Sequence, residues 1–270
     1  MVRAGWCFIG ILCALVGAAA EEMVGQPGAV NFVDGQAAIE GKAIAPGALE
    51  GTAAAAGQTL STTSGKAEAV LTPGAFLRLG EQSAVKMVSV SLADTQVEIV
   101  RGDAIIETVA AGAGRLQVLE GAARITIERP GIYEFHAGGP SVAVVRGRAK
   151  VVLNDHASEL GSGRQLTIGG SESRLARTAR QDALSQWSSQ RAGIDARASV
   201  DTAQALVGTN PANWKGPGWY WNPFFAEWGF LPATYTESGP YGETYFSAKF
   251  YWEYGPVPNT HLHGYFTPVH

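Results

Sequence analysis

The histidines of this chain are the residues whose type and spacing come closest to a metal site. His261 and His263 stand one residue apart, a spacing that places both imidazoles on one side of a strand, and His270 follows them. Transition-metal sites in proteins combine imidazoles with cysteine or carboxylate ligands, and no aspartate or glutamate lies close to these three histidines. The sequence therefore predicts no metal site, with the three side chains exposed to solvent.

Four glutamates provide carboxylates of the kind that a glycoside hydrolase uses. Such enzymes place two carboxyl groups about 5 to 10 Å apart across the scissile bond. The spacing of these four does not show that any two converge, so an envelope glycan hydrolase is the least favoured interpretation. The four lie among aromatic residues near the C-terminus and are Glu227, Glu237, Glu243 and Glu253.

Two glycine-containing motifs resemble nucleotide-binding loops and both are incomplete. Ser64-Gly65-Lys66 matches the end of a phosphate-binding loop, but Leu60 stands where its first glycine belongs and Ala67 replaces the metal-binding hydroxyl residue. Gly112-x-Gly114 lacks the third glycine of a dinucleotide-binding turn. We therefore expect no catalytic residue and no cofactor, and we expect that the protein is not an enzyme.

Aromatic residues offer the main ligand hypothesis, because 18 of the 25 tryptophans, tyrosines and phenylalanines lie between residues 210 and 270, together with 8 of the 13 prolines. Sugars present apolar faces that stack on aromatic rings, so this segment is a candidate glycan or peptidoglycan platform. The interpretation that we favour is a small core, in which the rings bury apolar area and hold the segment against the rest of the chain. The candidate stacking residues are Trp219, Trp221, Trp228, Tyr251 and Trp252.

The N-terminus has the pattern of a secretory signal peptide. Arg3 supplies a positive charge, residues 6–16 are uncharged and apolar, and Ala18-Ala19-Ala20 before Glu21 forms a small-residue cleavage site. A membrane-spanning helix needs about 20 apolar residues, and this run is shorter. We expect cleavage after Ala20, a periplasmic or secreted protein, and no transmembrane helix after cleavage.

Both cysteines, Cys7 and Cys13, lie within this leader. The mature chain is therefore expected to form no disulfide and no thiolate metal site. The formal net charge of −4 becomes more negative when Arg3 is removed, and nucleic-acid binding depends on basic surface. We expect no nucleic-acid partner.

Residues 24–170 predict an all-β domain, because short alternations of apolar and polar residues are separated by glycines and Pro-Gly turns. No stripe of helical length interrupts this zone. A loose Gly-x-Ala repeat favours stacked coils, so the domain is predicted as irregular and either β-solenoid-like or sandwich-like. The glycines of this repeat are Gly35, Gly65, Gly102, Gly121 and Gly147.

Two further segments follow the β zone. Residues 171–206 predict one amphipathic helix that ends near Gly193, with Trp187 as the side chain that anchors it to the β-domain. Its apolar face comprises Leu175, Ala179, Ala183, Leu184 and Trp187. Residues 210–270 form the C-terminal segment rich in aromatic residues, proline and glycine.

Several linked motifs of the β zone resemble a FecR domain, an extracytoplasmic module of bacterial cell-surface signalling proteins. They are Gly57-Gln58-Thr59-Leu60-Ser61-Thr62, Gly65-Lys66-Ala67-Glu68-Ala69-Val70-Leu71, Phe76-Leu77-Arg78-Leu79 and Glu81-x-Ser83. Two later stretches are similar to segments of exported relatives, Asp182-x-Leu184-x-x-Trp187-x-x-x-Arg191 to the helix after the domain and residues 218–225 to an aromatic tail.

The resemblance implies a FecR-type fold and a non-enzymatic function as an extracytoplasmic interaction or sensory scaffold in the bacterial cell envelope. The partner would be an envelope protein or a glycan, and a glycan-binding or peptidoglycan-binding module is the alternative. Signalling members carry a cytoplasmic anti-sigma segment and a membrane helix before the domain. Only a cleavable leader precedes it here, so we do not expect direct contact with a sigma factor.

Overall fold

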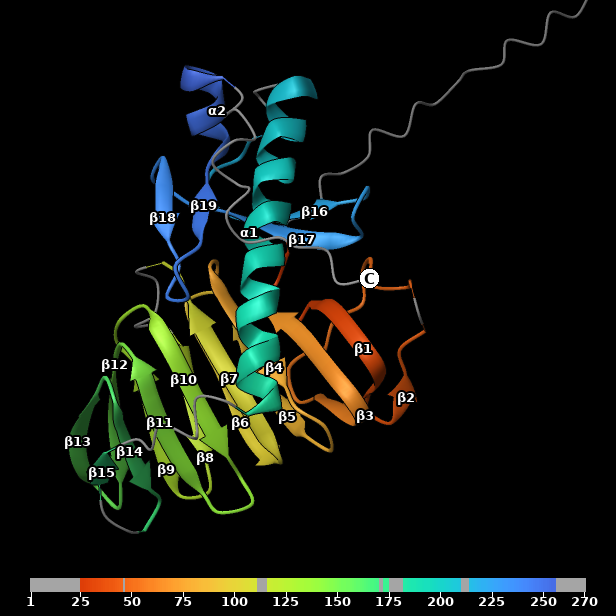
Figure 1. The fold of residues 1–270 in the computed structure, drawn as a ribbon. Helices are drawn as coiled ribbons and strands as arrows, with labels where there is room; N and C mark the ends of the chain where they lie inside the picture. Colours follow the sequence, from red (N-terminus) through yellow and green to blue (C-terminus); the bar gives the residue numbers. More distant parts are fainter. Residues whose placement is uncertain are drawn as a thin grey trace, which may run out of the picture.

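The computed structural model describes residues 25–45, 47–110, 116–169, 172–174, 182–209 and 214–255. The predicted leader and the three C-terminal histidines lie outside these ranges. Strands β1 to β15 of the described residues belong to one large sheet (Figure 1). They are β1 (Val30–Ile39), β2 (Lys42–Ala43), β3 (Thr59–Val70), β4 (Ala75–Leu79), β5 (Ala84–Ser91), β6 (Asp94–Arg101), β7 (Asp103–Thr108), β8 (Leu116–Glu120), β9 (Ala123–Ile127), β10 (Gly131–His136), β11 (Ser141–Arg146), β12 (Arg148–Leu153), β13 (His156–Gly161), β14 (Arg164–Thr167) and β15 (Glu172–Arg174).

The sheet folds over on itself into a nearly closed, flattened barrel. Its hydrogen-bonded order is β13-β12-β9-β8-β6-β5-β3-β4-β7-β10-β11-β14-β15, with β1 and β2 branching from β3. β13 stands at one end of this order and β14 next to the other end, and the two strands are consecutive in the chain. The turn between them therefore brings the two edges of the sheet together. The predicted all-β domain is confirmed. Its pairs are antiparallel except for β6 with β8, which fits the sandwich-like alternative better than stacked parallel coils.

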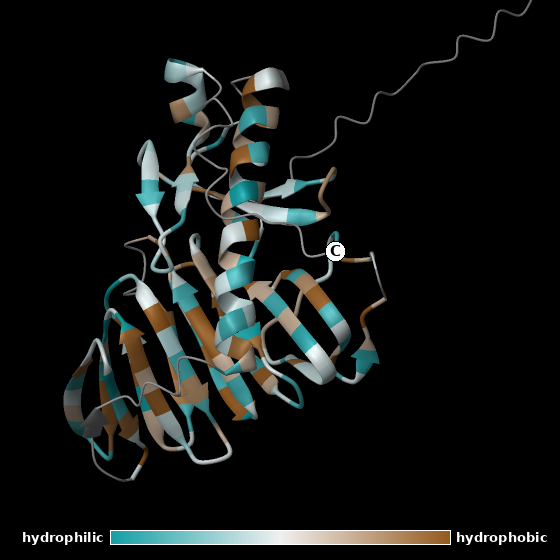
Figure 2. Ribbon diagram, viewed as in Figure 1, coloured by the Kyte–Doolittle hydropathy of each residue, from teal (hydrophilic) through white to brown (hydrophobic). Residues whose placement is uncertain are grey.

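Successive side chains of a strand point to opposite faces of the sheet, and Figure 2 shows hydrophobic and hydrophilic residues alternating along the strands. In the middle of the sheet both faces are nevertheless buried. Leu77 and Ile106 point into the barrel and belong to its main core. Phe76 and Ile105, one position earlier in each strand, belong to separate clusters that include residues of the helix crossing the outside of the sheet. Strands β4 and β7 are therefore buried on both faces.

The five glycines of the Gly-x-Ala repeat all have positive φ angles, which glycine adopts without steric cost. Gly65 pairs with Gly35 in the antiparallel ladder of β1 and β3, and a Cβ atom at Gly65 would lie 1.9 Å from the Asp34 carbonyl oxygen. The motif Ser64-Gly65-Lys66 is thus part of a strand, where glycine permits the close approach of the two backbones, and does not form a phosphate-binding loop.

One long helix, α1 (Ala183–Thr209), runs across the outer face of the sheet. It begins where the Asp182 carboxylate accepts the Ser185 backbone N–H at 2.6 Å, as an N-cap does. Trp187 packs against Phe32 of β1 with ring centroids 6.4 Å apart, so it contacts the sheet as predicted. Of the predicted apolar stripe, Leu175 and Ala179 lie outside the described residues.

The predicted end of the helix near Gly193 is wrong, because α1 continues for four further turns to Thr209. Beyond Gly193 the buried face is built from small and polar residues, among them Asp195, Ser199 and Ala203. Their contacts with the sheet and the C-terminal segment offset the weak helix propensity of glycine. An apolar pattern cannot reveal a buried face of this composition.

The C-terminal segment packs against the half of α1 that extends beyond the sheet (Figure 1). None of the helices in the described ranges is long and apolar enough to cross a membrane. The segment contains two short hairpins and a short helix: β16 (Gly218–Asn222) with β17 (Glu227–Leu231), β18 (Thr236–Ser238) with β19 (Thr244–Phe246), and α2 (Ala248–Tyr254).

Candidate functional site: a buried charged cluster beneath the long helix

Charged side chains meet in the interface between α1 and the sheet. Strand alternation directs Glu68 of β3, Arg78 of β4 and Glu107 of β7 outward, and Glu68 and Arg78 are cross-strand partners. One face of α1 contributes Arg191 and Asp195, which are four residues apart and therefore neighbours on the helix surface. All five residues are at most 2% exposed, so ionic groups occupy positions where hydrophobic side chains would be expected.

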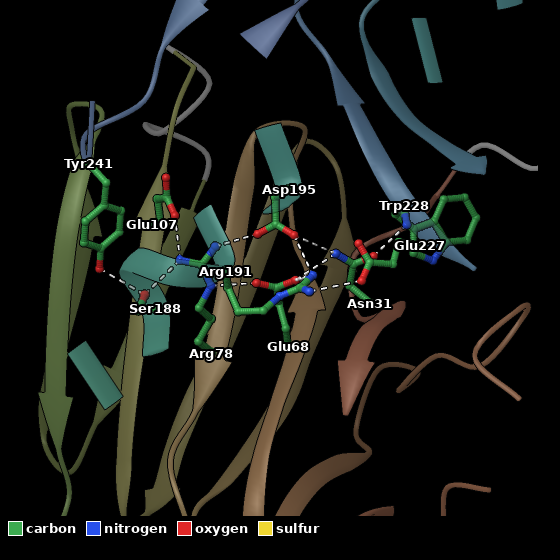
Figure 3. Close-up of polar contacts among 10 residues, drawn as sticks. All are labelled: Asn31, Glu68, Arg78, Glu107, Ser188, Arg191, Asp195, Glu227, Trp228 and Tyr241. Atoms are coloured by element: carbon green, nitrogen blue, oxygen red, sulfur yellow. Dashed lines mark hydrogen bonds and ion pairs between the residues drawn. The ribbon is translucent and has the colours of Figure 1, made fainter. Parts of the chain in front are cut away.

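Arg78 is the centre of this arrangement (Figure 3). Its Nε lies 2.6 Å from Glu68 Oε2, its Nη1 lies 2.5 Å from Glu107 Oε2, and its Nη2 lies 2.8 Å from Asp195 Oδ2. Nη1 also donates to Ser188 Oγ of α1 at 2.8 Å. One guanidinium therefore links three strands of the sheet to two turns of the helix.

Arg191 connects the same cluster to the C-terminal segment. Its Nη2 lies 3.0 Å from Glu68 Oε1 and 2.7 Å from Asp195 Oδ1, and its Nη1 lies 3.0 Å from Glu227 Oε1 of β17. The guanidinium carbon lies 4.3 Å from the centroid of the Phe32 ring, a cation–π contact. The planar donor fork of arginine suits this set of acceptors, whereas a lysine would supply only a point charge.

Neutral groups complete the network. Asn31 of β1 donates to Glu68 Oε1 at 2.8 Å and accepts the Trp228 backbone N–H at 2.6 Å. Tyr241 O–H donates to Ser188 Oγ at 3.0 Å. We call the whole set the charged cluster, and it consists of Asn31, Glu68, Arg78, Glu107, Ser188, Arg191, Asp195, Glu227 and Tyr241.

Burial and charge act in opposite directions on the carboxyl groups. Burial by itself opposes ionisation of Glu68, but the charges of Arg191 and Arg78 outweigh it and lower the Glu68 pKa to about 2. At Glu107 burial outweighs the attraction of Arg78, and the neighbouring Glu243 carboxyl adds to it, so the pKa is raised well above its usual value. Retention of a proton at Glu107 reduces the excess of four carboxylates over two guanidiniums.

The charged cluster is suited to holding parts of the chain together. Its ionic groups are sealed from solvent, and their hydrogen bonds are directed at one another. Within the described ranges, no group of three or more His, Cys, Asp or Glu residues could hold a metal ion. Buried ion pairs add little net stability when they form, yet they penalise any arrangement that leaves one charge unpaired. The cluster therefore specifies how α1 and the hairpins sit on the sheet.

The five candidate stacking residues do not share one surface. Trp219, Trp228 and Tyr251 are buried, as the small-core interpretation predicts, and the Trp219 indole donates to the Leu71 carbonyl at 3.0 Å. Trp221 is half-buried and packs on Trp228 with ring centroids 5.2 Å apart. Trp252 is the one with a largely exposed ring, at 55%.

The glutamates considered for hydrolysis each contact a different residue. Glu227 pairs with Arg191, and Glu243 lies beside Glu107. The Glu237 carboxylate accepts from Thr234 Oγ1 at 2.8 Å. The Glu253 carboxylate accepts from Tyr235 O–H at 2.6 Å.

A second feature of the C-terminal segment is the tip of the β16–β17 hairpin. Phe224 is 85% exposed and Phe225 is 55% exposed. The turn is fixed, because the Asn222 side chain accepts the Phe224 backbone N–H at 3.1 Å and donates to Thr202 Oγ1 of α1 at 3.2 Å. We call Phe224 and Phe225 the phenylalanine tip.

Several residues of the charged cluster lie within the motifs noted in the sequence, but their types and spacing predicted no role for them. Glu68 and Arg78 stood within the FecR-like motifs, and Arg191 stood within the helix motif. A charged residue at the outward position of a short strand is normally solvated, so the pattern itself gave no reason to bury it. The available signal was the coincidence of lone charges in apolar strands with a helix face carrying Arg191 and Asp195 four residues apart.

Comparisons with known proteins gave few matches. No protein-family model matches the chain, and no curated protein matches it. Among solved structures it is similar to two crystal structures from Parabacteroides distasonis, each described as a "putative anti-sigma factor". The first has 16% identity over 46% of this chain and 64% of that chain, with a TM-score of 0.40. The second has 14% identity over 43% and 59%, with a TM-score of 0.37, so this chain spans less than two thirds of either.

Proposed function

We propose that this protein is an exported, non-enzymatic FecR-like scaffold of the bacterial cell envelope that binds a partner protein through the phenylalanine tip. The FecR-like motifs and the leader pattern support the class and the compartment. The observation that carries the proposal is the exposure of two adjacent phenylalanines on a turn whose conformation is fixed.

The contacts that hold the β16–β17 hairpin in one conformation favour binding of a partner at the phenylalanine tip. Glu227, at the first position of β17, is paired with Arg191, and the Trp228 backbone is held by Asn31. Gly229 packs so closely on α1 that a Cβ atom there would lie 2.4 Å from Thr202 Oγ1. A preorganised hairpin loses little conformational entropy on binding, so more of the contact energy contributes to affinity.

The chemistry of the tip fits an apolar pocket on a protein. Full burial of a phenylalanine side chain contributes roughly 1.5–3 kcal/mol, so the two rings together can supply a large share of the contact energy of a transient complex. The net charge of −4 disfavours close approach to an anionic lipid surface. A protein partner is therefore favoured over a membrane.

Site-specific photo-crosslinking in cells that naturally produce the protein tests this proposal. A benzophenone amino acid replaces Phe224 in one variant and Val100 in the control, because Val100 is 51% exposed on β6 and lies outside the hairpin. We expect one protein adduct that is specific to position 224 and is lost when Phe225→Ala is added.

Identical adducts at both positions would contradict the proposal, as would adducts at position 224 that contain lipid only. Absence of any protein adduct at 224, with normal folding by circular dichroism, would also refute it. If crosslinking identifies a partner, the purified partner should bind the unmodified protein. Its affinity for Phe224→Ala should be about tenfold lower or more, which corresponds to a loss of at least about 1.4 kcal/mol.

A further inference from the structure

A hollow of about 330 Å³ lies on the C-terminal segment, away from both the charged cluster and the phenylalanine tip. Trp214, Lys249, Trp252 and Glu253 line it. Trp214 belongs to the stretch that leads into β16, and the other three residues lie on α2. The volume is at the lower end of the range of small-ligand sites, which extends from about 300 to 1,000 Å³.

Two indole rings form the apolar part of the hollow. Trp252 is 55% exposed, so its indole ring presents an apolar face on which a ligand can stack. Trp214 is half-buried against the cluster around Tyr251, and its indole N–H is buried without a hydrogen-bond partner among the described residues.

Two ions provide the polar part. Lys249 and Glu253 are one turn apart on α2, so both side chains project on the same side of the helix. Tyr235 positions both, because its O–H donates to Glu253 Oε2 at 2.6 Å and its ring lies 4.7 Å below Lys249 Nζ. A hydrogen-bond donor and an acceptor are thus held at the margin of an aromatic surface.

This combination identifies the ligand by its chemistry. A pyranose ring has one apolar C–H face that stacks on an indole and equatorial hydroxyls that both donate and accept hydrogen bonds. A lipid chain would cover Lys249 and Glu253 without offering either of them a hydrogen bond, and a simple anion would make no use of the two tryptophans. We propose that this hollow binds a pyranose unit of an oligosaccharide.

The site differs from the platform predicted from sequence. Trp252 is common to both, but Trp219, Trp228 and Tyr251 are buried and do not line the hollow, whereas Trp214, Lys249 and Glu253 do. The proposal does not rest on the phenylalanine tip, because the two features use different residues. Either one can fail while the other holds.

Titration of the full chain with chitotriose and with cellotriose, followed by tryptophan fluorescence and calorimetry, tests the proposal. We expect saturable binding of at least one probe, weakened about tenfold or more by Trp252→Ala. Phe224→Ala is the matched control, since it removes another exposed aromatic ring outside the hollow, and it should leave the affinity unchanged. Lys249→Met and Glu253→Gln should each weaken binding severalfold.

Two outcomes would overturn the proposal. One is the absence of binding of both probes at concentrations of about 10 mM, where even a weak site with a dissociation constant near 1 mM would be mostly occupied. The other is equal affinity in Trp252→Ala and the control. Thermal unfolding of each variant distinguishes loss of the site from loss of the fold. If Trp252→Ala unfolds, Lys249→Met and Glu253→Gln still test the site.

Discussion

The replacement Glu120→Gln should make the protein more stable at alkaline pH and leave its stability almost unchanged in acid. Glu120 ends strand β8 and is 1% exposed. Burial raises its pKa to about 7, although the backbone N–H groups of Ser141 and His136 and the charge of His136 oppose the rise. Glutamine has nearly the same shape but cannot ionise.

The magnitude follows from that pKa. A rise from 4.5 to about 7 corresponds to about 3 kcal/mol at about 1.36 kcal/mol per unit, and partial screening reduces our expectation to about 2 kcal/mol. Because the folded-state pKa is the higher one, the folded protein retains a proton that the unfolded chain releases. Stability is therefore full below pH 4.5 and falls as the pH rises to about 7.

Urea denaturation at unit intervals from about pH 4 to pH 8, followed by tryptophan fluorescence, measures the effect. The gain in free energy of unfolding of Glu120→Gln over wild type should grow from near zero in acid to about 2 kcal/mol above pH 7. The hydrogen bond with Asp103 raises the pKa of His136, so the stabilisation that protonated His136 gives the fold is also lost as the pH rises. His136 is present in both proteins, so this loss affects both.

Glu50→Gln is the control, because it makes the same substitution at an exposed position and should change the free energy of unfolding by less than about 0.5 kcal/mol. A constant difference between Glu120→Gln and wild type across the whole range would refute the reasoning. A difference that is largest in acid would refute it as well, since that sign belongs to a carboxyl with a lowered pKa.

The remaining predictions concern packing and the charged cluster. Arg78→Met should lower the free energy of unfolding by about 3–5 kcal/mol in urea denaturation, because it removes a buried guanidinium and leaves Arg191 as the one arginine of the charged cluster for its buried carboxyl groups, whereas Arg148→Met at an exposed pair should change it by less than about 1 kcal/mol. Equal effects would contradict the importance of burial. Gly229→Ala should cost about 1–3 kcal/mol in the same assay through its clash with Thr202, and unchanged stability would show that the hairpin can shift on α1. Trp219→Ala should cost about 3–5 kcal/mol and lower the melting temperature measured by circular dichroism, and a smaller change would indicate that the aromatic packing is loose.

The strands were predictable because their signal is local. Leu77 and Leu79 alternate with Phe76 and Arg78 in β4, and this period of two needs no knowledge of the rest of the chain. What the pattern could not reveal is that the second face is covered as well. That depends on a helix more than 100 residues later in the sequence, and within β4 the one sign of it is Arg78, a lone charge in an apolar strand.

The end of α1 and the exposure of the candidate site residues were not predictable from local sequence patterns either. The face of α1 after Gly193 is buried through Asp195 and Ser199, so a test for hydrophobic periodicity ends the helix too early. Among the aromatic residues, composition predicted dense packing but could not separate buried Trp219 from exposed Trp252. That distinction depends on which residues the β16–β17 hairpin and α2 turn toward α1.

Because β4 and β7 are covered on both faces, the sheet depends on α1 for the burial of its outer side chains. A fragment that ended before α1 would expose Phe76 and Arg78 of β4 to water together. Because α1 follows all the strands of the sheet in the chain, these side chains gain their helix partners only after the whole sheet has been synthesised. We therefore expect that a truncation or fusion boundary placed between the sheet and α1 destabilises the sheet as well as the helix.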